Sequence, residues 1–212
     1  MEYYRGLQVR TTLEEMCDPQ RMALVVYDMQ VGVMNQIAES DQVTERALAV
    51  LQAAREAGIR TFFTRHLTLP LEVTGTSGLR TAMAWQRTDD VTKVVSTFPR
   101  DSAQFQLVPE LTPLASEAVL DKIAMSAFVG TPLDFAFRDA GIEAFAIMGV
   151  ALEVGIEPTV RHGLDLGYLP IVIVDACGPG NRDAAERSLA QLAYFGGSIQ
   201  TDSATVSALL TR

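Results

Sequence analysis

The sequence has little of the residue types on which disulfides and metal sites depend. Its 212 residues include two cysteines and two histidines. Cys17 and Cys177 match no metal-binding spacing and need not form a disulfide, which favours a reducing cytoplasm over secretion. No third ligand stands at metal-binding spacing from His66 or His162, so we expect neither a metal nor another cofactor.

Long apolar runs and clusters of positive charge are also missing. Apolar runs such as FAIMGVAL are shorter than the about 20 residues that cross a bilayer. Acidic residues outnumber basic ones by 26 to 17, and this balance argues against nucleic acid or an anionic membrane as a partner. We therefore expect a cytoplasmic, soluble protein whose ligand is a small molecule.

What the sequence does contain is a repeated order of helix, turn and apolar run. The stretches EAGIRTFFT, DAGIEAFAIMGV and DLGYLPIVIVDA each join a helix end, a glycine and a candidate strand. Three more candidate strands lie at 22–28, 118–121 and 197–202. The pattern predicts one domain over residues 1–212, a three-layer α/β/α fold with an open, doubly wound, mainly parallel six-stranded sheet.

One long segment interrupts this order. Between Leu67 and Gln106 the periodicity weakens, and only one short helix is predicted, around 79–87. Long ordered loops often act as lids or interface elements, which makes Met83 and Trp85 candidates for substrate or subunit contact. The alternative is that these side chains only cover the edge of the core.

Two charged residues stand at the ends of predicted strands. Asp28 follows ALVVY, and Lys122 follows AVLD. The carboxyl ends of parallel strands form the edge at which open α/β sheets bind ligands. Asp28 alone is also explained as a cap, and Lys122 alone as a solvated charge. If the two converge, they form an acid/base pair in which the ammonium holds the carboxylate in place.

The segment CGPGNRDAAERS, at 177–188, follows the fifth candidate strand and opens a helix. It lacks the spacing of a phosphate-binding or dinucleotide-binding loop, so it is better interpreted as a turn. Cys177 has no histidine beside it in sequence to activate its thiol, and it is better interpreted as a small buried apolar residue than as a nucleophile.

Four stretches together carry a family resemblance. LVVYDMQVGV, TFFTRH, DKIAMSAFVGTPLD and MGVALEVGIEPTVRHGLDLGYLPIVIVDAC resemble the isochorismatase-like hydrolases, or cysteine hydrolase superfamily, from about Met22 to Asp202. Most members use an Asp, a Lys and a nucleophilic Cys. Asp28 and Lys122 match the first two, whereas Gly155 stands at the position of the Cys.

The resemblance implies a reaction without a covalent intermediate. The isochorismatases themselves resemble this sequence in that they have glycine at this turn. They cleave an enol ether by protonation of the substrate and addition of water. Mapped onto this sequence, Asp28 is the general acid, Lys122 is its electrostatic partner, and Gly155 leaves room for the substrate. Replacement of Gly155 by Cys is then expected to create a reactive thiol.

The resemblance also implies where the substrate binds. The family carries a cis peptide bond that corresponds to Val150–Ala151, next to a site for a carbonyl or oxyanion. The resemblance places Glu153 at a position where isochorismatases have a histidine. Its carboxylate is therefore expected to bring negative charge to the pocket. The residues assigned to the substrate-binding region are Val150, Ala151, Glu153, Val154, Trp85 and Phe128.

The resemblance further implies a homodimer or homotetramer. Two functions remain open from the sequence. One is a hydrolase that acts through Asp28 and Lys122, and the other is a binding protein that kept the pocket and lost catalysis together with the nucleophile.

Overall fold

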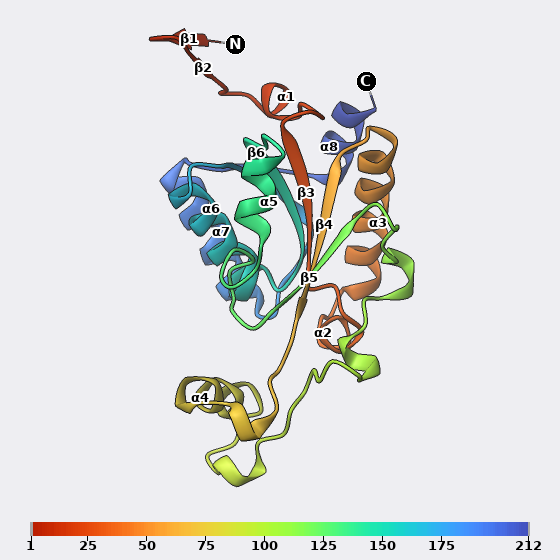
Figure 1. Ribbon diagram of the computed structural model, residues 1–212, viewed down its shortest axis with the longest axis vertical. Helices are drawn as coiled ribbons and strands as arrows, with labels where there is room; N and C mark the ends of the chain where they lie inside the picture. Colours follow the sequence, from red (N-terminus) through yellow and green to blue (C-terminus); the bar gives the residue numbers. More distant parts are fainter. Residues whose placement is uncertain (1, 212) are drawn as a thin grey trace.

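The computed structural model describes residues 2–211, and Met1 and Arg212 lie outside the described residues. A six-stranded sheet runs through the middle of the molecule (Figure 1). Its strands are β3 (Met22–Tyr27), β4 (Arg60–His66), β5 (Ala118–Lys122), β6 (Ala144–Val150), β7 (Leu169–Gly178) and β8 (Ile199–Thr201). Neighbouring strands are parallel, in the order β5-β4-β3-β6-β7-β8. The chain leaves β3 first toward one edge and later toward the other, so the predicted doubly wound sheet is confirmed.

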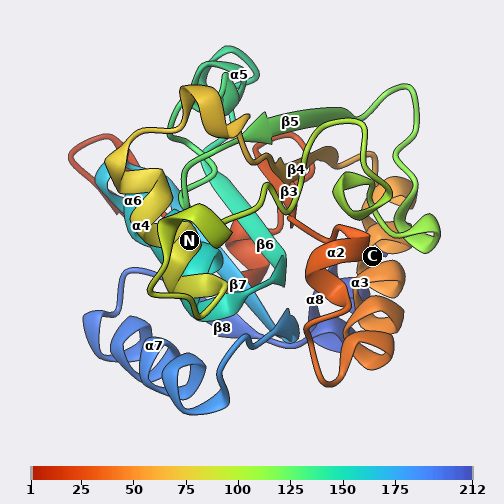
Figure 2. The ribbon, with the colours of Figure 1, turned by 90° about the horizontal axis from the view of Figure 1, so that it is seen from below.

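Helices cover both faces of this sheet. Figures 1 and 2 show α3 and α8 on one face and α5, α6 and α7 on the other, which confirms the three layers. The helices are α1 (Leu13–Met16), α2 (Val31–Met34), α3 (Ser40–Glu56), α4 (Thr76–Trp85), α5 (Leu133–Asp139), α6 (Glu157–Asp165), α7 (Arg182–Phe195) and α8 (Ser203–Leu210). The short helices are η1 (Leu71–Val73), η2 (Val91–Lys93), η3 (Ala103–Phe105), η4 (Pro109–Leu111) and the π-helix η5 (Leu152–Ile156). No helix within residues 2–211 is long and apolar enough to cross a membrane.

The apolar pattern explains why these layers form. Every residue of β3 and of β6 is buried, as expected for parallel strands that are covered on both faces. In α3, the buried residues Val43, Ala47, Val50, Leu51 and Ala54 form one stripe that faces the sheet. A second apolar cluster fills the opposite face, beneath α5, α6 and α7.

The N-terminal hairpin was not predicted. β1 (Glu2–Tyr4) and β2 (Leu7–Val9) pair in antiparallel fashion and are fully exposed. The two-residue turn between them, Arg5 and Gly6, has positive φ at both positions, 50° and 81°, as the preferred hairpin turns require. The Arg-Gly pair was the available signal, but the strands are too short to show a pattern.

The segment between β4 and β5 projects from the rest of the molecule, with α4 at its far end (Figure 1). Helix α4 begins at Thr76 and ends at Trp85, slightly earlier than predicted. None of its residues is buried, and Trp85 is 48% exposed. Met83 is partly buried, and the ring of Trp85 lies 5.8 Å from that of His66 at the end of β4.

We predict that the protein is a homo-oligomer, because this projecting segment exposes apolar side chains. Val73, Trp85, Val91 and Val95 are between 48% and 66% exposed, and association would remove them from water. Light scattering at micromolar concentration should give a multiple of the 23.0 kDa chain mass. A monomer under these conditions would contradict the prediction.

Candidate active site

Asp28 and Lys122 converge at the carboxyl edge of the sheet. Asp28 directly follows β3, and Lys122 is the last residue of β5, with β4 between the two strands. The Nζ of Lys122 donates to Oδ2 of Asp28 at 2.6 Å, across 94 residues of sequence. The two side chains are 0% and 7% exposed. The predicted pair therefore exists as a buried ion pair.

Further hydrogen bonds satisfy this pair. The hydroxyl of Thr64, on the intervening strand, donates to Oδ1 of Asp28 at 2.6 Å. Lys122 also donates to the carbonyl of Ala124 at 3.1 Å. Such bonds are needed because the attraction of two buried charges offsets their loss of hydration only when the geometry is good and the other polar atoms are paired. Thr64 was missed from sequence, where it looks like an ordinary strand residue.

The backbone at Asp28 helps to aim its carboxylate. Asp28 has φ of 47°, in the left-handed region that Asp tolerates better than most residues. Its amide lies 3.2 Å from both the carbonyl and the hydroxyl oxygen of Thr64. The turn therefore ends β3 sharply while its carboxylate stays against β4.

Gln30, two residues further on, fixes the neighbouring strand end. Its side-chain amide donates to the carbonyls of His66 and Phe105, and its oxygen accepts from the amide of His66 at 2.6 Å. Gln30 is fully buried. A buried amide with all of these partners holds β3, β4 and η3 together. Its position two residues after a strand-end Asp was the only sequence signal for this role.

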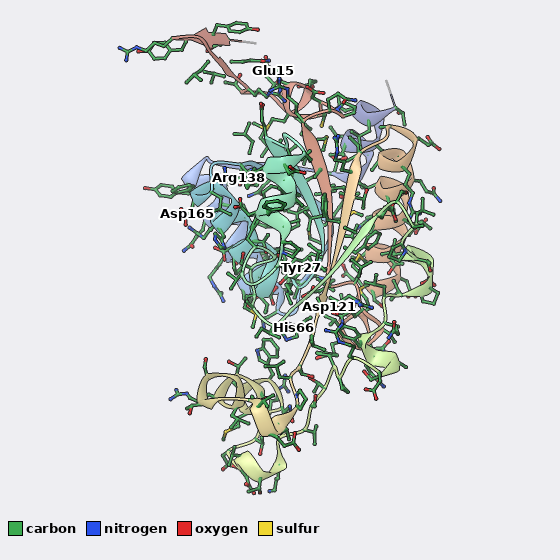
Figure 3. All side chains as sticks on the ribbon, in the orientation of Figure 1. Glu15, Tyr27, His66, Asp121, Arg138 and Asp165 are labelled. Carbon is green, nitrogen blue, oxygen red and sulfur yellow. The ribbon has the colours of Figure 1, made fainter. Side chains whose placement is uncertain are left out.

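His66 lies beside the ion pair and joins it to the projecting segment. Its ring centroid is 5.8 Å from that of Trp85 and 6.2 Å from that of Phe98. Figure 3 shows Tyr27 and His66 at the end of the sheet that is nearer to α4. Burial lowers the pKa of His66, and the nearby charges of Asp28 and Lys122 oppose each other, the first raising it and the second lowering it. Trp85 therefore reaches the candidate site through His66.

The turn after β6 completes this edge of the sheet. The peptide bond between Val150 and Ala151 is cis, and the chain then enters η5, where the amide of Gly155 donates to the carbonyl of Ala151 at 2.9 Å. β6 lies against β3, with Gly149 opposite Tyr27. A Cβ on Gly149 would come within 3.0 Å of the Tyr27 backbone, so only glycine fits there.

The volume that a side chain at Gly155 would take is filled by Tyr27, so this volume is not what the glycine leaves for a substrate. A Cβ built on Gly155 would lie under 3.0 Å from the hydroxyl oxygen and two ring carbons of Tyr27. The Tyr27 side chain is buried, at 2% exposed. The glycine is required by packing against this ring.

Glu153 also differs from the expectation. Its carboxylate accepts from the amides of Asn181 at 2.6 Å and Gly180 at 3.2 Å, in the turn that precedes α7. The glycine-containing segment after β7 therefore binds a carboxylate of its own chain, which agrees with its interpretation as a turn. Glu153 directs its charge to that turn.

The other assigned residues separate into two groups. Val150 and Ala151 lie at the end of β6, next to the strand that carries Asp28, and Val154 is exposed on η5. Phe128 instead packs in an aromatic core cluster. Its ring neighbours in that cluster are Phe137, Phe145, His162 and Tyr168.

Neither cysteine is placed as a nucleophile. Burial raises the pKa of the Cys177 thiol to about 12, and its sulfur contacts the carbonyl of Ile147. Burial also raises the pKa of Cys17 to about 11. The thiolate is the reactive form, and a raised pKa disfavours it near neutral pH. Within residues 2–211, no three His, Cys, Asp or Glu side chains are grouped so as to hold a metal ion.

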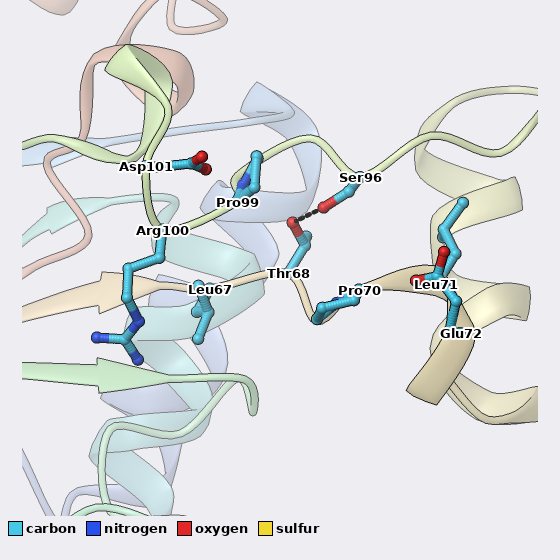
Figure 4. Close-up of a pocket in the computed structure, with 9 residues that line it drawn as sticks. All are labelled: Leu67, Thr68, Pro70, Leu71, Glu72, Ser96, Pro99, Arg100 and Asp101. Carbon is cyan, nitrogen blue, oxygen red and sulfur yellow. Dashed lines mark hydrogen bonds between the residues drawn. The ribbon is translucent and has the colours of Figure 1, made fainter.

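A cavity of about 540 Å³ opens at the base of the projecting segment (Figure 4). The hydroxyls of Thr68 and Ser96 meet there at 2.7 Å. It is lined by Leu67, Thr68, Pro70, Leu71, Glu72, Ser96, Pro99, Arg100 and Asp101. Asp28 and Lys122 do not line this cavity, so its size gives no measure of the space around the ion pair.

Comparison with known sequences finds one matching family. The isochorismatase domain matches residues 22–203. The chain is 30% identical over 173 residues to the isochorismatase family protein YwoC of Bacillus subtilis, a match that covers 81% of this chain and 85% of that protein. It is 31% identical over 176 residues to the ureidoacrylate amidohydrolase RutB of Serratia proteamaculans, covering 74% and 70% of the two chains.

Solved structures show the same fold. A cysteine hydrolase from Pseudomonas syringae superimposes with a TM-score of 0.78 at 23% identity, over 91% of this chain and 93% of that one. N-carbamoylsarcosine amidase from Thermoplasma acidophilum superimposes with a TM-score of 0.70 at 22% identity, over 86% and 96%.

We predict that the buried ion pair contributes strongly to stability. Lys122→Ala leaves the carboxylate of Asp28 buried and unpaired, which should lower the free energy of unfolding by about 3–5 kcal/mol. As a control, Arg182→Ala breaks an ion pair with Glu39 whose side chains are 65% and 48% exposed, and should cost at most about 1 kcal/mol. Urea unfolding of the three proteins measures both values, and equal losses would contradict the prediction.

We also predict a pH-dependent contribution from His66. The pKa of His66 is below its ordinary value of 6.5 in the folded protein, so the unfolded chain takes up this proton first as the pH falls. The contribution of neutral His66 is complete above pH 6.5 and is lost as the pH falls from there through the folded-state pKa. Urea unfolding between pH 7.5 and pH 5 should therefore show a larger loss of unfolding free energy for the native protein than for His66→Phe. An equal loss in both proteins would contradict the prediction.

Proposed function

Since the chain belongs to the isochorismatase family, a family of hydrolases, we propose that it hydrolyses a small molecule with Asp28 as general acid and base and Lys122 as its electrostatic partner, without a covalent cysteine intermediate. The observation that supports this is the buried contact of the two side chains at 2.6 Å, at the carboxyl edge of the sheet. This edge, between β3 and β6, is where the strand order reverses, and open α/β sheets bind ligands at such switch points.

The proposed reaction is the cleavage of an enol ether or a related C–O or C–N bond. In the enol ether case, the Asp28 carboxylate that is paired with Lys122 first takes up a proton from water. It then gives this proton to the vinyl carbon, which leaves an oxocarbenium ion on the substrate and restores a carboxylate beside the ammonium of Lys122. Water adds to the cation, and its surplus proton returns to Asp28. The resulting hemiketal separates into a carbonyl compound and an alcohol, so that one water is consumed and the protonated Asp28 is restored.

Each partner of Asp28 has a role in this cycle. Lys122 stabilises the negative charge that forms when the proton leaves, and its own position is fixed by the carbonyl of Ala124. Thr64 holds the other carboxylate oxygen. The carbonyl or oxyanion of the substrate is expected at the turn that follows Val150, at the same edge of the sheet as Asp28.

Two features support a reaction without a thiol. Position 155 is glycine, and desolvation raises the pKa of buried Cys177 and of partly buried Cys17. The amide bond chemistry implied by the names of RutB and N-carbamoylsarcosine amidase therefore needs another nucleophile here, and water activated by Asp28 can serve as one. The substrates named in those two proteins nevertheless suggest ureido and carbamoyl compounds as ligands to test.

A second function is a protein that binds such a small molecule without converting it. The filled space at Gly155 and the low exposure of the ion pair favour this alternative, because both leave little room for a reacting group. Hydrolysis of a bound ligand distinguishes the enzyme from the binding protein, because only the enzyme converts the ligand.

The test begins with a ligand screen. Enol ethers, ureido acids and N-carbamoyl amino acids are added singly, and the melting temperature is measured, since a ligand that binds only the folded state raises it whether or not it reacts. Compounds that raise the melting temperature are then followed for hydrolysis by mass spectrometry. A ligand that binds and remains intact would support the binding function.

We predict that Asp28→Asn abolishes hydrolysis of any substrate found in this way. The amide keeps the size of the side chain and one hydrogen-bond acceptor, but it cannot donate the required proton. The matched control is Asp121→Asn, at the end of β5, whose carboxylate is bound to Arg65 and Arg100 and whose loss should leave turnover in place. Substantial activity in Asp28→Asn would exclude the proposed chemistry.

A further inference from the structure

Tyr27 and Gly155 compete for one volume. Tyr27 ends β3 and sends its side chain to the face of the sheet that α6 covers, where it lies in the apolar cluster with Leu152 and Ile156. A Cβ at position 155 would overlap the hydroxyl oxygen, Cζ and Cε1 of this ring. The clash involves the ring itself as well as the hydroxyl, so the rotation of a flexible side-chain end does not relieve it.

Tyr27 also contacts Lys122 of the ion pair and the loop that follows β5. Its hydroxyl donates to the carbonyl of Met125, in the loop that follows β5. The Nζ of Lys122 lies 4.3 Å from the centroid of its ring, a cation–π contact. One aromatic ring therefore borders the ammonium on one side and the backbone of η5 on the other.

The phenol is a neutral group in this place. Burial raises the pKa of Tyr27 well above 10, and the adjacent charge of Asp28 raises it further. The hydroxyl therefore keeps its proton near neutral pH and does not supply an anionic nucleophile in place of the absent thiol.

We propose that Tyr27 is a positioning residue of this site, whose ring occupies the space that a side chain at position 155 would need and holds the ammonium of Lys122 in line with Asp28. The role in positioning rests on the proposed function of the ion pair, whereas the exclusion of a side chain at position 155 does not. It follows that a nucleophile can be introduced at position 155 only together with a smaller residue at position 27.

The first experiment tests the shared volume by thiol labelling. Gly155→Cys, Tyr27→Ala/Gly155→Cys and Tyr27→Phe/Gly155→Cys are treated with iodoacetamide, and modification of Cys at position 155 is followed by intact mass and peptide mapping. The Ala double variant should label on the order of tenfold faster than the others, because an occluded thiol reacts only after local opening. The Phe double variant is the matched control, since its ring still fills the space.

Stability gives a second readout of the same volume. Gly155→Cys should lower the melting temperature by several degrees through overpacking, and the shift of the Ala double variant should be smaller than the sum of the single shifts. Gly75→Cys is a control at an open position, where a Cβ meets no atom within 4 Å. If Gly155→Cys yields no folded protein while the Ala double variant folds, the proposal is supported. Additive shifts and equal labelling rates would overturn it.

The second experiment tests the contact with Lys122 and needs no substrate. Lys93 and Lys122 are the two lysines of the sequence, so protein labelled with ¹⁵N at lysine carries two side-chain ammonium groups. The side chain of Lys93 is 72% exposed and serves as an internal reference, whereas that of Lys122 is fully buried. The aromatic ring should shield the ammonium protons of Lys122 in the native protein and in Tyr27→Phe, and Tyr27→Leu should lose this shielding.

The outcomes separate the two proposals. A Lys122 signal that is the same in the native protein and in Tyr27→Leu would exclude the positioning role, whatever the activity of the protein. Turnover that survives Asp28→Asn would exclude the proposed function, and it would leave the labelling and NMR results unchanged.

Discussion

The candidate site depends on one buried ion pair. Asp28 and Lys122 lose almost all of their contact with water, a cost that a single attraction offsets only when every remaining polar atom is paired. Thr64 and the carbonyl of Ala124 supply those partners. All four residues lie on or directly after β3, β4 and β5, which are adjacent and parallel, so the order of three strands sets the geometry of the chemistry.

The switch point of the sheet then determines what surrounds the pair. β6 lies on the other side of β3, close enough that Gly149 and Gly155 each meet Tyr27, one at its backbone and one at its ring. The turn after β6 therefore lies at the same edge of the sheet as Asp28. This close packing also leaves no space in which a side chain could stand at position 155, because the ring of Tyr27 occupies that volume.

Membership of the isochorismatase family and the fold are consistent with one another, but neither fixes the reaction. N-carbamoylsarcosine amidase shares the fold, and the ureidoacrylate amidohydrolase RutB is similar in sequence. In this chain, the ring of Tyr27 fills the volume at Gly155, and Glu153 is bound to the turn before α7.

The sequence by itself determined the fold class, the six strands of the sheet and the candidate pair, because apolar runs and strand-end charges are local patterns and parallel strands bring their ends to one edge. It did not determine the partners of that pair. Thr64 and Gln30 have no distinguishing pattern, and the hairpin strands are too short for one. Only the tertiary structure decided that Tyr27 fills the space at Gly155 and that Glu153 points to another turn. Each depends on two segments far apart in the sequence, whose side chains share a space that exists only after the strands have packed.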